Sequence, residues 1–196
     1  MIDTPHGPAR AHILEAEGEA RAALMLGHGA GGGFAARDLQ AVTAVAQELG
    51  YLVALIEQPY LVAGRRSAAP AHQLDAAWLA VLEHLRGGEL AGLPLVAGGR
   101  SSGARVACRT APAAGAAAVL CLAFPVHPPG RPAKSRLDEL DAVEAPVLVI
   151  QGESDPFGMP PDAPGREVVA VPGTHSFSAA GIGALTEAAR AWLEQR

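Results

Sequence analysis

Short apolar segments alternate along this chain with segments of helical periodicity, and this alternation restricts the folds that the chain can adopt. Most of the apolar segments lack polar alternation, as parallel strands do when helices cover both faces of their sheet. Strands that alternate with helices predict an α/β sheet. The predicted strands are Ala11–Ala16, Ala22–Leu26, Leu52–Ile56, Leu93–Ala97, Ala117–Phe124, Pro146–Gln151 and Glu167–Val171.

Stripes of apolar residues at helical spacing lie between or after these strands. They cover Leu39–Leu49, Leu74–Leu85 and Ile182–Trp192, and Gly50 follows the first as a typical residue at a helix C-terminus. Trp78 and Trp192 lie on these stripes, so we expect them to be core residues. A chain of 196 residues fits one domain. The sequence therefore predicts a single α/β domain over residues 1–196, with about seven mostly parallel strands and helices on both faces.

Composition excludes several classes of protein. The net charge of −5 and the lack of a basic patch argue against nucleic acid as a partner. Prolines interrupt the longest uncharged run, Thr110–Gly130, and its apolar part is too short for a membrane helix. Cys108 and Cys121 are too few for a disulfide scaffold, so we expect buried thiols. With no apolar leader at the N-terminus, we expect a soluble, cytoplasmic protein.

A nucleophile motif follows the fourth predicted strand. Gly99, Ser101 and Gly103 form a G-x-S-x-G sequence between a strand and a helical segment. An abrupt turn from strand to helix requires small residues two positions before and after the nucleophile. If the turn were centred on Ser102, Arg100 would occupy one of these tight positions. We therefore predict that Ser101 is the nucleophile.

An acid and a base follow the last two predicted strands. A serine hydroxyl needs a base, and that base needs an acid to orient it. Asp155 follows Pro146–Gln151 closely, and His175 follows the last strand, in the chain order Ser, acid, His of the hydrolase arrangement. Glu153 is the rival acid, but we expect it to lie in the exit of its strand. Since the carboxyl ends of parallel strands meet at one edge, these side chains should converge.

A glycine-rich loop, Gly27–Gly33, follows the second predicted strand. Glycines let the backbone direct N–H groups at a developing oxyanion. We assign this role to the N–H groups of Ala30, Gly31 and Ser102. His28 is expected mainly to hold the loop by hydrogen bonds, and it is also a candidate for substrate contact.

The same loop permits a second interpretation. Gly27, Gly29 and Gly32 match the G-x-G-x-x-G pattern of dinucleotide-binding proteins, and Glu57 could bind a ribose. This interpretation leaves Ser101, Asp155 and His175 unexplained. The histidines show no metal-ligand spacing, and no phosphate-binding loop with lysine is present. We therefore expect no cofactor and no metal.

With these residues in place, the chain resembles the α/β-hydrolase superfamily along nearly its whole length. More closely, it is similar to a group of small hydrolase-like proteins that includes a testis-expressed protein, a chromatin acetyltransferase-complex subunit and bacterial predicted hydrolases. The resemblance implies a Ser-Asp-His site in a fold without cofactor. The segments that carry it are Gly27–Gly32, Gly98–Arg105, Phe124–Pro132, Gln151–Gly158 and Gly173–Phe177.

The segment between Phe124 and Pro146 departs from larger relatives, many of which insert a cap domain there. It is short and proline-rich and has room for one short helix near Arg136–Val143. His127 and Arg131 lie on it and are candidates for substrate contact. Without a large lid, the site suits a small or protruding acyl substrate. We expect a serine hydrolase, most simply a carboxylesterase acting as a monomer or homodimer; the alternative is a hydrolase-like interaction module with little catalysis.

Overall fold

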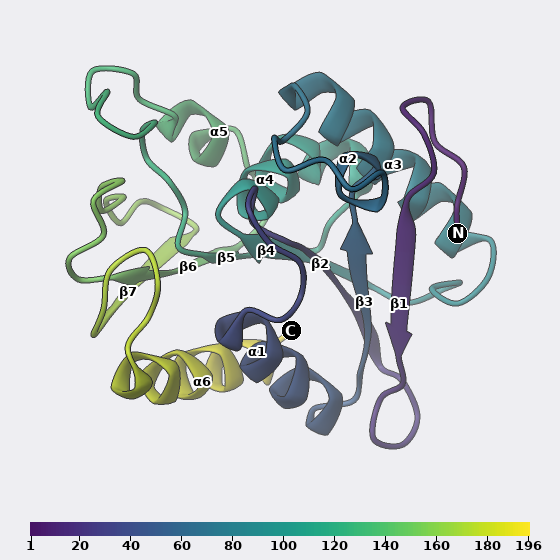
Figure 1. Ribbon diagram of the computed structural model, residues 1–196. Helices are drawn as coiled ribbons and strands as arrows, with labels where there is room; N and C mark the ends of the chain where they lie inside the picture. The colour runs from purple at the N-terminus through teal and green to yellow at the C-terminus, as the bar shows by residue number, and fades with distance from the viewer.

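The computed structural model describes residues 1–196, and its centre is a seven-stranded sheet with the order β1-β3-β2-β4-β5-β6-β7 (Figure 1). Every neighbouring pair from β3 to β7 in this order is parallel, and only β1 runs antiparallel to its neighbour β3. The predicted mostly parallel sheet is confirmed. The strands are β1 (Arg10–Leu14), β2 (Ala22–Gly27), β3 (Tyr51–Glu57), β4 (Leu95–Arg100), β5 (Ala118–Leu122), β6 (Val147–Gly152) and β7 (Arg166–Val171).

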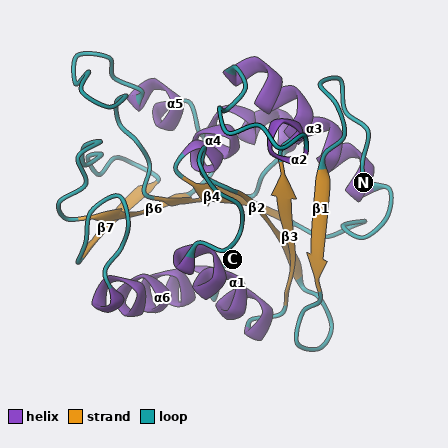
Figure 2. Ribbon diagram, viewed as in Figure 1, coloured by secondary structure: helices purple, strands orange, loops and turns teal.

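Helices cover both faces of the sheet, as expected for strands that are buried along their whole length (Figure 2). Helices α1 (Arg37–Glu48) and α6 (Ala179–Leu193) lie side by side on one face. The other helices lie on the opposite face; they are α2 (Pro59–Val62), α3 (Ala71–Arg86), α4 (Ser102–Ala114) and α5 (Leu137–Asp141).

The sheet separates two hydrophobic cores. Trp78 of α3 is fully buried in the core beneath α3 and α4, and Trp192 of α6 lies in the core beneath α1 and α6. Consecutive strand residues alternate between the two, since Met25 packs in the first core and Leu24 in the second. Both tryptophans are therefore core residues, as the helical stripes predicted. The cysteines are buried free thiols; a hydrogen bond between Cys108 and Cys121, together with burial, raises the pKa of the Cys121 thiol.

Several details differ from the sequence prediction. Strand β4 starts at Leu95, because Leu93 closes a turn by donating its N–H to the Leu90 carbonyl. Strand β5 ends at Leu122, because Ala123 has φ 50°, outside the extended region. The short helix α2 was not predicted at all.

The connection from β5 to β6 contains only the five-residue helix α5 and no cap domain (Figure 1). This confirms the expected lack of a large cap, although the helix is shorter than the predicted Arg136–Val143. None of the helices combines the length and the apolar character that a membrane crossing requires.

Candidate active site

Ser101 occupies a strained turn between β4 and α4. Its φ of 52° lies in the left-handed region, which costs a residue other than glycine about 1–3 kcal/mol. The turn packs tightly against Gly27 of β2. A Cβ on Gly99 would come within 2.5 Å of the Gly27 carbonyl oxygen, and one on Gly103 within 2.3 Å. Close backbone approach therefore explains both glycines of the motif.

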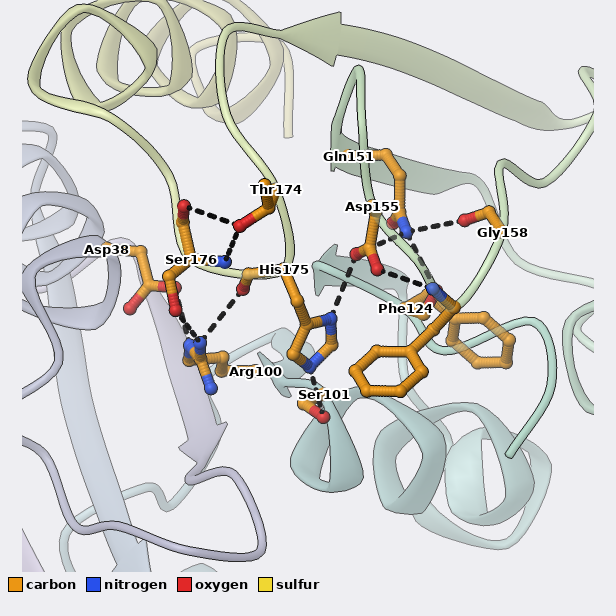
Figure 3. A network of polar contacts seen from close by, with 11 residues as sticks. Asp38, Arg100, Ser101, Phe124, Gln151, Asp155, Gly158, Thr174, His175 and Ser176 are labelled. Carbon is orange, nitrogen blue, oxygen red and sulfur yellow. Dashed lines mark hydrogen bonds and ion pairs between the residues drawn. The ribbon is translucent and has the colours of Figure 1, made fainter. Parts of the chain in front are cut away.

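The structure brings the three predicted side chains together at the carboxyl edge of the sheet (Figure 3). His175 Nε2 lies 2.9 Å from Ser101 Oγ, and His175 Nδ1 lies 2.9 Å from Asp155 Oδ2. The Asp155 carboxylate is fully buried, and the ring of Phe157 packs edge-on against the imidazole at 4.4 Å between centroids. Glu153, the rival acid, is exposed and makes no side-chain hydrogen bond, so Asp155 is the carboxylate that faces the imidazole.

Gln151 anchors the acid, and the sequence analysis did not identify it. Its buried side-chain amide donates to Asp155 Oδ2 at 2.9 Å and to the carbonyls of Phe124 and Gly158 at 3.0 and 2.8 Å (Figure 3). The Phe157 N–H donates to Asp155 Oδ1 at 2.8 Å. These contacts fix the carboxylate plane that faces the imidazole. Its place in the sequence could have indicated this role, because Gln151 is the next-to-last residue of a buried strand that is followed by the candidate acid.

Arg100 anchors the loop that carries the histidine. Its Nε donates to Asp38 Oδ2 at 2.8 Å, and its Nη2 donates to the His175 carbonyl at 2.9 Å (Figure 3). Asp38 lies in the first turn of α1, where a carboxylate is also favoured by the helix dipole. The Arg100 guanidinium thus connects α1, β4 and the β7–α6 loop around the candidate nucleophile.

The glycine-rich loop lies beside Ser101 and carries free donors. The N–H groups of Ala30 and Gly31 donate no hydrogen bond within the chain, and both residues line the same pocket as Ser101 and Ser102. Ser102 is the first residue of α4, where an N–H has no intrahelical acceptor. The Tyr60 hydroxyl holds the loop by donating to the Ala30 carbonyl at 3.0 Å, and burial raises the pKa of Tyr60 to about 12.

Comparison with known proteins identifies the family of this chain. Residues 20–177 match the model of a family described as alpha/beta hydrolase domain. The chain belongs to the α/β-hydrolase family. No curated protein matches the sequence.

Solved structures of this hydrolase fold superpose over nearly the whole chain. Est1E from Butyrivibrio proteoclasticus with ferulic acid bound has a TM-score of 0.80 at 16% identity, covering 99% of this chain and 97% of its own. A serine hydrolase without lid from Xanthomonas campestris has a TM-score of 0.74 at 23% identity, and the match covers 97% of this chain and 92% of that one. A dienelactone hydrolase from Anabaena variabilis has a TM-score of 0.74 at 18% identity, and the match covers 99% of this chain and 94% of that one.

The hydrolase pocket beside Ser101 has a volume of about 420 Å³. Its apolar walls come from the segment between α2 and α3, from the first turn of α3, from the β5–β6 connection and from Phe157. Its polar walls include several arginines that the sequence analysis did not assign to the site. The lining residues used below are Ala69, Leu74, Arg105, Arg109, Pro125, Pro129 and Arg136.

The three residues predicted to contact substrate do not line this pocket. His28 is buried: its Nε2 accepts the Gln58 N–H at 3.2 Å, and its Nδ1–H donates to the Gly29 carbonyl at 2.8 Å. Burial lowers the pKa of His28, which favours the neutral ring. Its two hydrogen bonds hold the loop, which is the main role expected from the sequence. His127 bonds to the neighbouring Pro128 carbonyl, and Arg131 is exposed to solvent. In this structure none of the three lines the pocket that contains Ser101, and their contact with substrate stays a prediction.

The geometry also disfavours the dinucleotide interpretation. The glycine-rich loop does not open directly into a helix, since α1 starts only at Arg37. Glu57 forms an ion pair with Arg10 at 2.8 Å. No group of three or more His, Cys, Asp or Glu side chains is arranged to hold a metal ion.

Proposed function

We propose that this protein is a serine hydrolase, most simply a carboxylesterase that acts through an acyl-enzyme on Ser101. The observation that carries the proposal is the unbroken hydrogen-bonded series from Ser101 Oγ through the His175 imidazole to the Asp155 carboxylate. Membership of the α/β-hydrolase family supports it.

In the first half of the reaction, Ser101 Oγ attacks the ester carbonyl while His175 Nε2 takes its proton. The Nδ1–H of His175 donates to Asp155, which fixes the tautomer and stabilises the imidazolium that forms. The N–H groups of Ser102 and of Ala30 or Gly31 stabilise the tetrahedral oxyanion. His175 then gives the proton to the leaving alcohol, and the acyl group stays on Ser101.

In the second half, water replaces the alcohol. His175 takes a proton from the water as it attacks the acyl carbonyl, and the same N–H groups stabilise the second oxyanion. Ser101 Oγ leaves with the proton from His175, which releases the acid. No cofactor is needed in either half.

The pocket supports a small or protruding acyl substrate. Its volume is about 420 Å³, and its outer wall is a short connection with Pro125 and Pro129 and no cap domain. The bound ferulic acid of Est1E and the description of the Xanthomonas campestris structure as lacking a lid are compatible with this class of substrate.

A fluorophosphonate probe followed by peptide mapping tests the proposal without a known substrate. We expect labelling of Ser101, loss of labelling in Ser101→Ala and retained labelling in Ser102→Ala, whose backbone N–H is unchanged. Asp155→Asn should slow ester turnover by roughly 10³- to 10⁴-fold, because the imidazole loses its correct tautomer.

Two outcomes would contradict the proposal. Labelling that persists in Ser101→Ala and disappears in Ser102→Ala would show that Ser102, and not Ser101, is the nucleophile. Folded protein that neither reacts with the probe nor cleaves any ester would favour the hydrolase-like interaction module.

A further inference from the structure

Three arginines besides Arg100 line the pocket that contains Ser101. Arg105 and Arg109 lie one turn apart on α4, the helix that begins directly after Ser101, and Arg136 directly precedes α5. Two acids, Asp75 of α3 and Glu139 of α5, pack among them.

The two arginines of α4 are fully paired with these acids. Arg105 donates to both oxygens of Glu139 at 2.8 and 2.5 Å. Arg109 donates to both oxygens of Asp75 at 2.8 and 2.6 Å, and it also reaches Glu139 at 3.3 Å. Each carboxylate is therefore already held by two hydrogen bonds or more.

The Arg136 guanidinium has no such partner. It makes no side-chain hydrogen bond and no ion pair, although it is partly buried in the pocket wall. Burial lowers the pKa of Arg136, and the nearby charge of Arg105 lowers it further, while Glu139 opposes the change. Three guanidinium groups against two carboxylates leave this wall with one uncompensated positive charge.

An uncompensated, partly desolvated cation is a site for an anion. Guanidinium groups bind carboxylates through paired, charge-assisted hydrogen bonds. We propose that Arg136 binds a carboxylate of the substrate, so that the enzyme prefers esters that carry one negative charge. The proposal rests on the hydrolase function proposed above and names its substrate class.

The position of Arg136 fits this role. It lines the same pocket of about 420 Å³ as Ser101, so one small molecule can present its ester to the serine and its carboxylate to the arginine. A single surplus charge matches a carboxylate monoanion better than a phosphate dianion. The apolar stretch between the two groups would lie against Leu74, Ala69 and Pro125.

Matched ester pairs test the proposal on the intact protein. The first pair is monomethyl glutarate and its neutral amide, methyl 4-carbamoylbutanoate. In this pair the acid carries its charge on the acyl side. The second pair is 4-acetoxybenzoate and 4-acetoxybenzamide, which places the charge on the leaving group. We expect kcat/KM for the acid to exceed that for the amide by roughly tenfold in one pair, mainly through KM.

Substitution assigns this preference to Arg136. Arg136→Gln should abolish the preference while neutral esters are still hydrolysed, and Arg136→Lys should retain part of it. Lys134→Gln is the matched control, because it removes one positive charge from the same connection at an exposed position outside the pocket. It should keep the preference. Where turnover is slow, protection of Ser101 from the fluorophosphonate by each acid and amide gives the same comparison.

The outcomes separate this inference from the proposed function. Probe labelling and neutral-ester turnover without any preference for the acids would overturn the inference alone. So would a preference that survives Arg136→Gln. Absence of both labelling and turnover would refute the hydrolase proposal, and the inference with it.

Discussion

The ion pair between Asp38 and Arg100 allows a quantitative prediction about how the site is held. Asp38→Asn keeps the size of the side chain but removes the charge that faces Arg100 Nε at 2.8 Å. The two side chains are 4% and 19% exposed, so water replaces the lost partner poorly. The guanidinium would then remain largely buried with only neutral acceptors, among them the His175 carbonyl.

The size of the effect follows from this burial. Removing one partner of a buried pair costs about 3–5 kcal/mol. Because Arg100 is partly exposed and keeps one carbonyl acceptor, we expect about 3 kcal/mol for Asp38→Asn. In a chain of this length, that loss lowers Tm by roughly 6–12 °C. Displacement of the His175 loop should also slow fluorophosphonate labelling by roughly 10- to 100-fold.

Urea unfolding measures the change in the free energy of unfolding. The rate of fluorophosphonate labelling is measured well below the Tm of the variant. Glu48→Gln is the control, because its ion pair with Arg190 lies on the surface and should leave the urea midpoint unchanged. The double variant Asp38→Leu with Arg100→Met should lose less stability than the sum of the single changes. A cost below about 1 kcal/mol for Asp38→Asn, or strict additivity in the double variant, would refute the reasoning.

Three further predictions concern the acid, the loop and the pocket. Gln151→Leu should slow labelling by roughly 10- to 100-fold, because Asp155 loses its buried donor; an unchanged labelling rate would remove Gln151 from the positioning role. Burial lowers the pKa of His28, so the unfolded chain binds a proton more readily; the urea midpoint should fall as pH drops below about 6.5. His28→Gln should flatten that fall, and an equally steep fall would contradict the assignment. Acetate and butyrate p-nitrophenyl esters should be cleaved with higher kcat/KM than the palmitate ester and without a rate increase at micelles, whereas a steady rise with chain length would indicate an apolar channel.

The candidate triad was predictable because each member directly follows a strand. Parallel strands bring their carboxyl ends to one edge, so chain position alone indicated that Ser101, Asp155 and His175 would meet. Local rules also sufficed to prefer Ser101 over Ser102, since the close packing of Gly99 and Gly103 on Gly27 is a property of the turn.

The supporting contacts were not predictable in the same way. Arg100 and Asp38 lie 62 residues apart, and Arg105 and Glu139 lie 34 apart, with no spacing that marks them as partners. Their pairing depends on how α1 and α5 pack against the sheet. For the same reason the sequence did not indicate that Arg136, rather than His127 or Arg131, lines the pocket: the path of the connection after β5 depends on tertiary packing.

The short connection between β5 and β6 has a consequence for the fate of an acyl group on Ser101. Enzymes that pass an acyl group to an alcohol or amine depend on closure to keep water away from the intermediate. Here the β5–β6 connection contributes only Pro125, Pro129 and Arg136 to the pocket wall, and it contains no cap domain. Solvent water would therefore outcompete an added alcohol or amine for the acyl group, and the partition would favour release of the free acid over transfer.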